Sequence, residues 1–122
     1  MHKFSMINTR ERPYLKWLNE GVKTAEGRVN SDKYRRIAVG DEIRFTDASS
    51  GEFIQGIVTF KHEYKTFAEM LRSEGVKNML PFLNDDELEK GIGVYQAFPG
   101  SARVKQFGCV AIGIKITTAQ LR

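Results

Sequence analysis

The sequence predicts an α+β fold in which a curved, mostly antiparallel sheet packs against helices. The chain ends in an apolar run at residues 109–116, which is typical of a strand covered on both faces. Residues 40–64 have the pattern of one long hairpin. Helical patterns lie on either side of this hairpin, within 10–20 and 66–98, and do not alternate with single strands. At 122 residues, the chain is expected to form one domain over residues 1–122.

The composition excludes a membrane protein or a disordered chain. Apolar residues make up 41% of the sequence and charged residues 28%, and no apolar run approaches the roughly 18 residues that a membrane span needs. The first residues lack an apolar segment followed by a cleavage site. The single cysteine, Cys109, cannot form an internal disulfide, and its apolar neighbours favour a buried packing role over a nucleophilic one. These features predict a cytoplasmic protein, and a monomer is favoured.

The net charge of +4 is unevenly distributed along the chain. Residues 1–45 hold ten Lys and Arg against six Asp and Glu, whereas the rest of the chain holds nine of each. The whole excess therefore lies in the first third, which suits a partner that carries phosphate groups, such as RNA or a nucleotide. The alternative is that a few surplus basic side chains lie on a solvated face.

The first predicted element is a short amphipathic helix within residues 10–20. Tyr14, Trp17 and Leu18 have helical spacing there, and Gly21 is a stop signal. Core packing is the favoured role for Trp17, the only tryptophan. Trp17 also lies one turn before a polar stretch, so the alternative is that its ring borders a cleft.

The polar stretch at residues 21–29 is the candidate functional site. In an extended strand, Thr24, Glu26 and Arg28 project to one face because side chains alternate. Lys23 lies on the other face of a flat strand and joins them only if the chain twists or bulges. The alternative is a solvated edge strand whose surface Glu–Arg pair contributes almost nothing to stability.

A loop and a hairpin follow this stretch. Residues 30–36, N-S-D-K-Y-R-R, are predicted to form a turn or loop with three basic residues. The hairpin starts at the Gly-Asp pair 40–41, turns at Gly51, and returns in a strand that continues toward His62 and Tyr64. Because His62 has no histidine or cysteine at a ligand spacing, the sequence predicts no metal site.

Two helices and a basic loop precede the last strand. Thr66 and Glu69 form a capping box that begins the first helix. Asn84 and Glu87 have the same spacing, and the apolar positions after them continue a second helix as far as Phe98. The acidic first turn of this helix could bind a cation, but complementing the helix dipole is the favoured role. A basic loop at 99–106 leads into the apolar strand.

Six segments of the sequence together resemble the ASCH domain family, in the family's order, from about Pro13 to Ile116. They are W-L-N-E-G-V-K-T-A-E-G-R, V-G-D-E-I-R-F, F-A-E-M-L-R-S-E-G, L-P, G-V-Y-Q-A-F and G-C-V-A-I-G-I-K-I. Among the family's branches, the sequence is most similar to the small stand-alone prokaryotic proteins. The resemblance implies a PUA-like fold, a small β-barrel flanked by helices, with a cleft between barrel and helices that receives RNA or a nucleotide.

The hallmark K-x-x-E-x-R of this family falls on Lys23, Glu26 and Arg28. The resemblance therefore implies that these three side chains line the cleft. A binding module needs cations for phosphate, a carboxylate for base or ribose donors, and aromatic faces for stacking, and it needs no cofactor. The expected ligand-binding residues are Lys23, Thr24, Glu26, Arg28, Trp17, Tyr14 and Tyr34.

A hydrolase of the same family is the alternative function. One branch is a bacterial acetylcytidine amidohydrolase that uses a lysine, a threonine and a glutamate, and other members act as ribonucleases. The lysine corresponds to Lys23 and the glutamate to Glu74, but the threonine falls on Glu26, and Thr24 lies two positions earlier. Such an enzyme would use Lys23 as the base and Glu26 or Glu74 to activate water. Binding of RNA, a nucleotide or a modified nucleoside is the preferred function.

Overall fold

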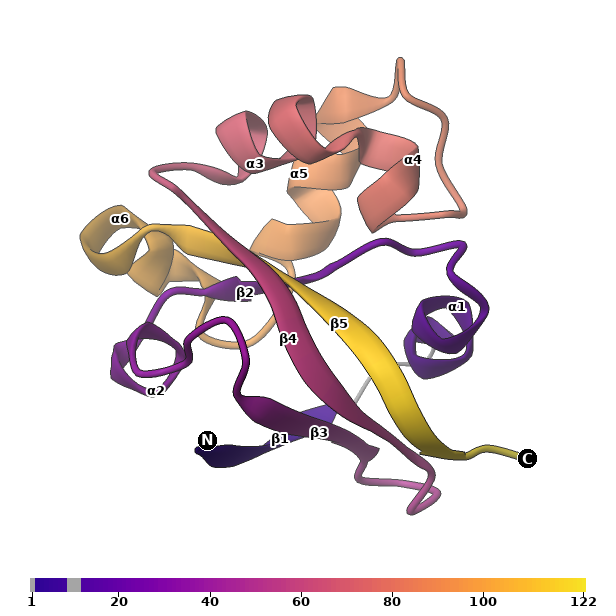
Figure 1. Ribbon diagram of the computed structural model, residues 1–122. Helices are drawn as coiled ribbons and strands as arrows, with labels where there is room; N and C mark the ends of the chain where they lie inside the picture. The colour runs from indigo at the N-terminus through magenta and orange to yellow at the C-terminus, as the bar shows by residue number, and fades with distance from the viewer. Residues whose placement is uncertain (1, 9–11) are drawn as a thin grey trace.

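The computed structural model describes residues 2–8 and 12–122, which form a five-stranded sheet with helices on its faces (Figure 1). The strand order is β1-β3-β4-β5-β2, and neighbouring strands are antiparallel except for β1 and β3, which are parallel. The α+β class with a mostly antiparallel sheet is therefore confirmed. The strands are β1 (Lys3–Asn8), β2 (Glu26–Val29), β3 (Glu42–Asp47), β4 (Phe53–Tyr64) and β5 (Cys109–Gln120).

The expected closed barrel is wrong, because the sheet formed by the described residues stays open, with β1 and β2 at its edges. A barrel requires every strand to pair on both sides. β2 has only four residues and pairs with β5 alone, so it cannot join β1 around the remaining gap. The curvature instead comes from the long pair β4–β5, whose register shifts at two places.

Helices α3, α4 and α5 gather over one side of the sheet, α1 lies beside the far half of β5, and α2 and α6 lie near β2 (Figure 1). None of the helices in the described part of the chain is long and apolar enough to cross a membrane. The helices are α1 (Tyr14–Glu20), α2 (Asp32–Arg35), α3 (Phe67–Glu74), α4 (Val76–Met79), α5 (Leu88–Gln96), the 3-10 helix η1 (Ser101–Arg103) and α6 (Val104–Phe107).

The predicted signals for α1 and α3 are confirmed. Gly21 ends α1 in the left-handed conformation with φ at 77°. The Thr66 hydroxyl accepts a hydrogen bond from the Glu69 N–H at 3.1 Å and begins α3. The predicted range for the first helix also included residues 10 and 11, which lie outside the described residues.

Helix α5 begins later than predicted, at Leu88 and not at Asn84. The Glu87 carboxylate does accept a hydrogen bond from the Asn84 N–H, at 3.0 Å, so one contact of the capping box forms. It closes a turn, however, and the helix starts only after it. The helix also ends at Gln96, so Phe98 lies beyond it.

Four short elements differ from the sequence-based expectations. β1 was not predicted, and it pairs with β3, almost forty residues away, as Lys3 does with Glu42. The predicted loop at 30–36 contains α2, and the basic loop at 99–106 contains η1 and the start of α6. One-turn helices have little stability of their own and depend on tertiary contacts, so local patterns are weak signals for them.

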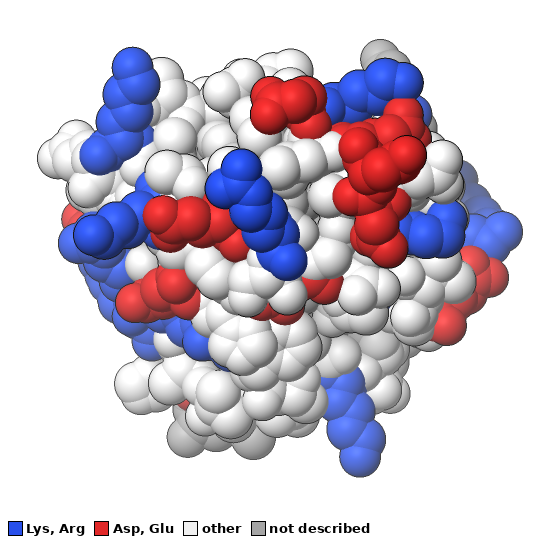
Figure 2. Space-filling view, turned by 90° about the horizontal axis from the view of Figure 1, so that it is seen from above, with Lys and Arg blue, Asp and Glu red and all other residues white. Residues whose placement is uncertain are grey.

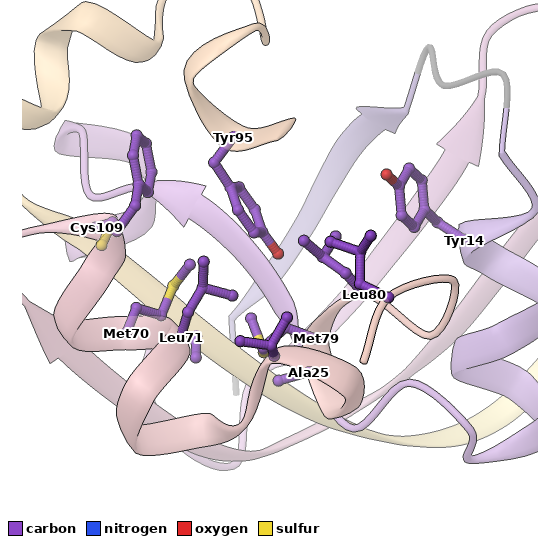
Figure 3. Packing of buried hydrophobic residues seen from close by; sticks show 12 residues of the cluster. Tyr14, Ala25, Met70, Leu71, Met79, Leu80, Tyr95 and Cys109 are labelled. Carbon is purple, nitrogen blue, oxygen red and sulfur yellow. The ribbon is translucent and has the colours of Figure 1, made fainter. Parts of the chain in front are cut away.

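Two apolar clusters lie on opposite faces of β5. Cys109 and Ala111 pack with α3, α4 and α5 in the first cluster, part of which is shown in Figure 3. Val110 and Ile112 pack in the second cluster, with apolar residues of β1, α1, β3 and β4. The prediction of a strand covered on both faces is confirmed for Cys109–Gly113, where all five residues are buried.

Candidate nucleotide-binding site

The charged side chains of the polar stretch are withdrawn from solvent. The exposed fraction of the side chain is 0% for Lys23, 5% for Glu26 and 10% for Arg28. β2 begins only at Glu26, and Lys23 lies in the bend between α1 and β2. Because the chain is bent there and not flat, the Lys23 side chain can reach the same side as Glu26 and Arg28. The alternative of a solvated edge strand with a surface ion pair is therefore excluded.

Two cations share the carboxylate of Glu26. Arg28 Nη1 lies 2.9 Å from Glu26 Oε1, and Lys23 Nζ lies 4.0 Å from the same oxygen. Lys23 Nζ also donates a hydrogen bond to the carbonyl of Met79 and lies 5.4 Å from the centre of the Tyr14 ring. Buried charges persist in a fold when they are paired and hydrogen-bonded, and this network meets both conditions.

Arg28 is held on several sides. Its Nε donates to the Tyr34 hydroxyl at 3.0 Å, and its Nη1 donates to the Gly27 carbonyl at 3.2 Å. Burial alone would lower the pKa of Arg28, but Glu26 and Tyr34 outweigh burial and raise that pKa above its usual value. The guanidinium is therefore a fixed, permanent positive charge.

The free edge of β2 is capped by the same side chains. The Gly27 N–H donates to Glu26 Oε1 at 3.2 Å, and the Gly27 carbonyl accepts from Arg28. In an antiparallel pair, every second residue directs its N–H and carbonyl away from the partner strand. Glu26 and Arg28 thus satisfy the backbone groups that an edge strand leaves unpaired.

A cavity of about 310 Å³ lies along β2, and we call it the β2 cavity. It combines two arginines with aromatic rings and serine hydroxyls, and none of the described residues that line it is acidic. The side chains used in the argument below are Arg28, Tyr34, Phe67, Tyr95, Phe98 and Arg103.

Tyr95 is fixed in the wall of this cavity. Its ring stacks on Phe67, with ring centres 5.4 Å apart, and meets Phe98 edge-on at 5.5 Å. A Cβ atom at Gly27 would lie 2.8 Å from the Tyr95 hydroxyl oxygen, so the ring can approach β2 only because residue 27 is glycine. Burial raises the pKa of Tyr95 well above its usual value, which keeps the hydroxyl protonated.

Trp17 lies outside the β2 cavity, at the border of the first cluster. Its ring is partly buried, stacks on Phe82 at 6.1 Å and meets the Tyr14 ring edge-on at 5.8 Å. The Arg12 guanidinium lies 3.8 Å from the centre of the Phe82 ring. Because Tyr14 also contacts Lys23, this aromatic group adjoins the ion network on the side of α1.

Thr24 and Glu74 lie outside the ion network. Thr24 is exposed and precedes β2, and its N–H donates to the carbonyl of Asn78 at 2.9 Å. The Glu74 carboxylate accepts a hydrogen bond from the Tyr64 hydroxyl and lies 2.8 Å from His62 Nδ1. It therefore joins the end of α3 to β4, whereas the carboxylate nearest to Lys23 in the described chain is that of Glu26.

The comparisons with known proteins show the family to which the chain belongs. A model of the ASCH domain family matches residues 9–117, which include the buried K-x-x-E-x-R network. The chain belongs to the ASCH domain family. Members of this family have a PUA-like fold and are associated with RNA binding in general, and the resemblance inferred from the sequence is confirmed.

Two solved structures are similar to this ASCH domain. The crystal structure of hypothetical protein PH0355 is 35% identical, with a TM-score of 0.80, and the match covers 94% of this chain and 99% of that one. The solution NMR structure of protein PF0455 from Pyrococcus furiosus is 32% identical, with a TM-score of 0.69, and the match covers 93% and 96% of the two chains. No curated protein matches the chain significantly.

Sequence reasoning missed much of the lining of the β2 cavity in this ASCH domain. Phe67, Tyr95, Phe98 and Arg103 come from segments about 40 to 75 residues after β2. Phe67 lies in the family segment F-A-E-M-L-R-S-E-G, and Tyr95 and Phe98 lie in the family segment G-V-Y-Q-A-F. The helical spacing of these segments predicted packing, and only the tertiary structure shows that the rings line a cavity.

Charge on the surface of the ASCH domain is mixed. Figure 2 shows acidic and basic side chains next to each other on the face above α3, α4 and α5, with no continuous basic field there. Within the described ranges, no group of three or more His, Cys, Asp or Glu could hold a metal ion. The positive charge available to a ligand is therefore better defined in the β2 cavity than on this face.

Proposed function

We propose that this ASCH domain binds RNA or a nucleotide in the β2 cavity. The observation that carries the proposal is the lining, in which Arg28 and Arg103 supply positive charge, aromatic rings supply stacking faces, and no described lining residue is acidic. Arginines bind phosphate groups, and aromatic rings such as Tyr34 and Phe98 stack on bases. The volume of about 310 Å³ is at the lower end of small-ligand cavities and suits one nucleotide unit.

The ion network supports this proposal because it orients Arg28 before a ligand arrives. Glu26, Tyr34 and the Gly27 carbonyl each hold the guanidinium, so little rotamer freedom remains to be lost on binding. Glu26 acts here as a positioning residue for Arg28. Lys23 keeps the network positive overall, since two cations face one carboxylate.

Arg103 provides the sharpest test because it lines the cavity and is exposed. Arg103→Ala removes one phosphate contact, so affinity for mixed-sequence single-stranded RNA should fall severalfold and the slope of log K against log salt by about 0.7. Arg72→Ala, which removes an equally exposed charge from α3, is the matched control and should bind like the wild type. Arg28→Ala should weaken binding across sequences, but it also removes a partner of the buried Glu26 carboxylate.

The affinity is measured by titrating the protein with nucleoside monophosphates and with the RNA, at salt concentrations between about 50 and about 200 mM. Wild-type affinity should weaken steeply over this range because phosphate contacts release counterions. Binding that ignores salt would contradict the proposal. So would the absence of binding to every oligonucleotide and nucleotide at the lower salt concentration.

A hydrolase is the second candidate, and the buried pair of Lys23 and Glu26 favours it. Once the Lys23 ammonium has given up a proton, its amine can act as a base, with the Glu26 carboxylate 4.0 Å away in a buried site. Incubation with acetylated cytidine and with mixed-sequence RNA, followed for deacetylation and for cleavage, separates enzyme from binding module. Turnover that Lys23→Ala abolishes, with binding within a few fold of wild type, supports the hydrolase. No product over many hours supports the binding module.

A further inference from the structure

We infer that the Tyr95 hydroxyl recognises the base that enters the β2 cavity, by donating a hydrogen bond to an acceptor atom on the edge of that base. This inference rests on the proposed function, because it assigns base specificity to the same cavity. Nothing in the family comparison assigns a role to Tyr95, and the K-x-x-E-x-R network does not include it.

The hydroxyl of Tyr95 lacks a hydrogen-bond partner in the part of the chain that the structure describes. The residue is only 2% exposed, and it lines the β2 cavity. Tyrosine hydroxyls that are buried normally find a partner, because an unpaired buried donor destabilises the fold. A ligand that fills the cavity can supply the partner that the chain does not.

The position of this hydroxyl is fixed by its neighbours. Phe67 and Phe98 hold the ring, and the missing side chain of Gly27 leaves room for the hydroxyl oxygen directly against β2. In Figure 3 the Tyr95 ring extends from its helix so that the hydroxyl points toward the side of Leu80. Because Gly27 lines the same cavity, an acceptor atom inserted at this end of it comes within reach of the donor.

The chemistry of the donor selects for an acceptor. Burial keeps the Tyr95 hydroxyl protonated at physiological pH, so its hydrogen is always available. Carbonyl oxygens and unprotonated ring nitrogens of bases accept such a hydrogen bond. A base that presents only an N–H at this point leaves the buried hydrogen unpaired, and a site built around a hydrogen bond discriminates strongly against such a ligand.

Tyr95→Phe tests the inference because it removes the hydroxyl and keeps the packing of the ring. Isothermal titration with AMP, CMP, GMP and UMP should show that the preferred nucleotide binds about tenfold more weakly and that the four affinities converge. The salt dependence should stay as in wild type, since no phosphate contact is lost. Without ligand, the melting temperature should equal or exceed that of wild type, because an unpaired hydroxyl has been removed.

Tyr64→Phe is the matched control, because its hydroxyl bonds Glu74 and Ser73 and does not line the β2 cavity. This variant should bind all four nucleotides as wild type does. Wild-type affinities in Tyr95→Phe would overturn the inference while the proposed function stands. A lower melting temperature with unchanged binding would also overturn it, by showing that the hydroxyl has a structural partner. If wild type binds none of the nucleotides, the proposed function itself fails.

Discussion

Glu26 shows how a single carboxylate can organise a site from inside the fold. It faces Arg28 at 2.9 Å and Lys23 at 4.0 Å, and all three side chains are withdrawn from water. Removing one member of a buried ion network leaves the remaining charges desolvated and uncompensated. The resulting loss in the free energy of unfolding is several kcal/mol larger than the loss of a surface ion pair. The side chain that holds Arg28 is therefore also important for stability.

Glu26→Gln is expected to lower the free energy of unfolding by roughly 3 kcal/mol, because two buried cations lose their counter-charge while the shape is kept. Urea unfolding measures this change. Glu89→Gln, at an exposed position of α5, is the control and should change stability by less than about 0.5 kcal/mol. A loss of less than about 1 kcal/mol for Glu26→Gln would show that the network is not the structural centre inferred here.

Gly27→Ala should destabilise the protein by about 1–3 kcal/mol, because the new Cβ lies 2.8 Å from the fixed Tyr95 ring and the packing must shift. Gly93→Ala is the matched control, since an added Cβ in this exposed part of α5 meets nothing within 4 Å. That control should stabilise the helix by about 0.5–1 kcal/mol. Equal effects of the two changes in thermal unfolding would argue against the close approach of Tyr95 to β2.

The sequence was sufficient to single out Lys23, Glu26 and Arg28 as candidate site residues, but not to show their burial. Alternation along a strand assigns side chains to faces, and it does not reveal which face the rest of the chain will cover. The cover comes from Tyr34 nearby and from Tyr95, which is almost seventy residues away from Glu26. A pattern within nine residues carries no information about such a distant ring.

At the scale of elements, caps and turns with their own hydrogen bonds were predictable, and elements that depend on distant partners were not. The Thr66 hydroxyl caps the start of α3, and Gly21 ends α1 because glycine readily adopts the left-handed conformation. β1 exists because β3, almost forty residues away, pairs with it, and tertiary context therefore decided this case. The contact between Asn84 and Glu87 is local and does form, but it closes a turn before α5.

Asp41 joins two elements and gives the fold a pH dependence. Its carboxylate accepts the Ala38 N–H at 2.9 Å and the His2 N–H at 3.1 Å, which ties the turn before β3 to the residue before β1. These two N–H groups, that of Ala38 first, lower the pKa of Asp41 below its usual value. The ionised form thus stabilises the fold above the unfolded pKa near 3.8, and this contribution is lost as the pH falls through the lower, folded pKa.

Asp41→Asn should therefore be less stable than wild type at neutral pH and should lose less stability between about pH 5 and about pH 3. Urea unfolding at a series of pH values measures both effects. Asp86→Asn, at an exposed turn before α5, should follow the wild-type pH profile closely. A pH profile of Asp41→Asn parallel to that of wild type would contradict the role given to this carboxylate.

For the whole molecule, β5 is a strand whose two faces contribute fully buried residues to both apolar clusters. Cys109 and Ala111 belong to one cluster, and Val110 and Ile112 belong to the other. Separation of the clusters would require the strand to lose one of its faces. We therefore propose that residues 1–122 unfold as one unit, although the two clusters lie on opposite sides of the sheet.

This proposal predicts a single urea transition. Trp17 fluorescence reports on the first cluster, which it borders, and far-UV circular dichroism reports on all helices and strands. Their midpoints and slopes should coincide, as two-state unfolding requires. Separate midpoints would mean that the helices over the sheet can open while the second cluster stays folded.

The position of Cys109 has a practical consequence for anyone who handles this protein. The thiol is fully buried where β5 meets α3, and burial raises its pKa to about 12, so Cys109, the single cysteine of the sequence, is protected from alkylating reagents in the folded protein. Its rate of modification then measures how often this part of the protein opens. A cysteine introduced at an exposed position would, for the same reason, take up a fluorescent dye selectively in the native protein.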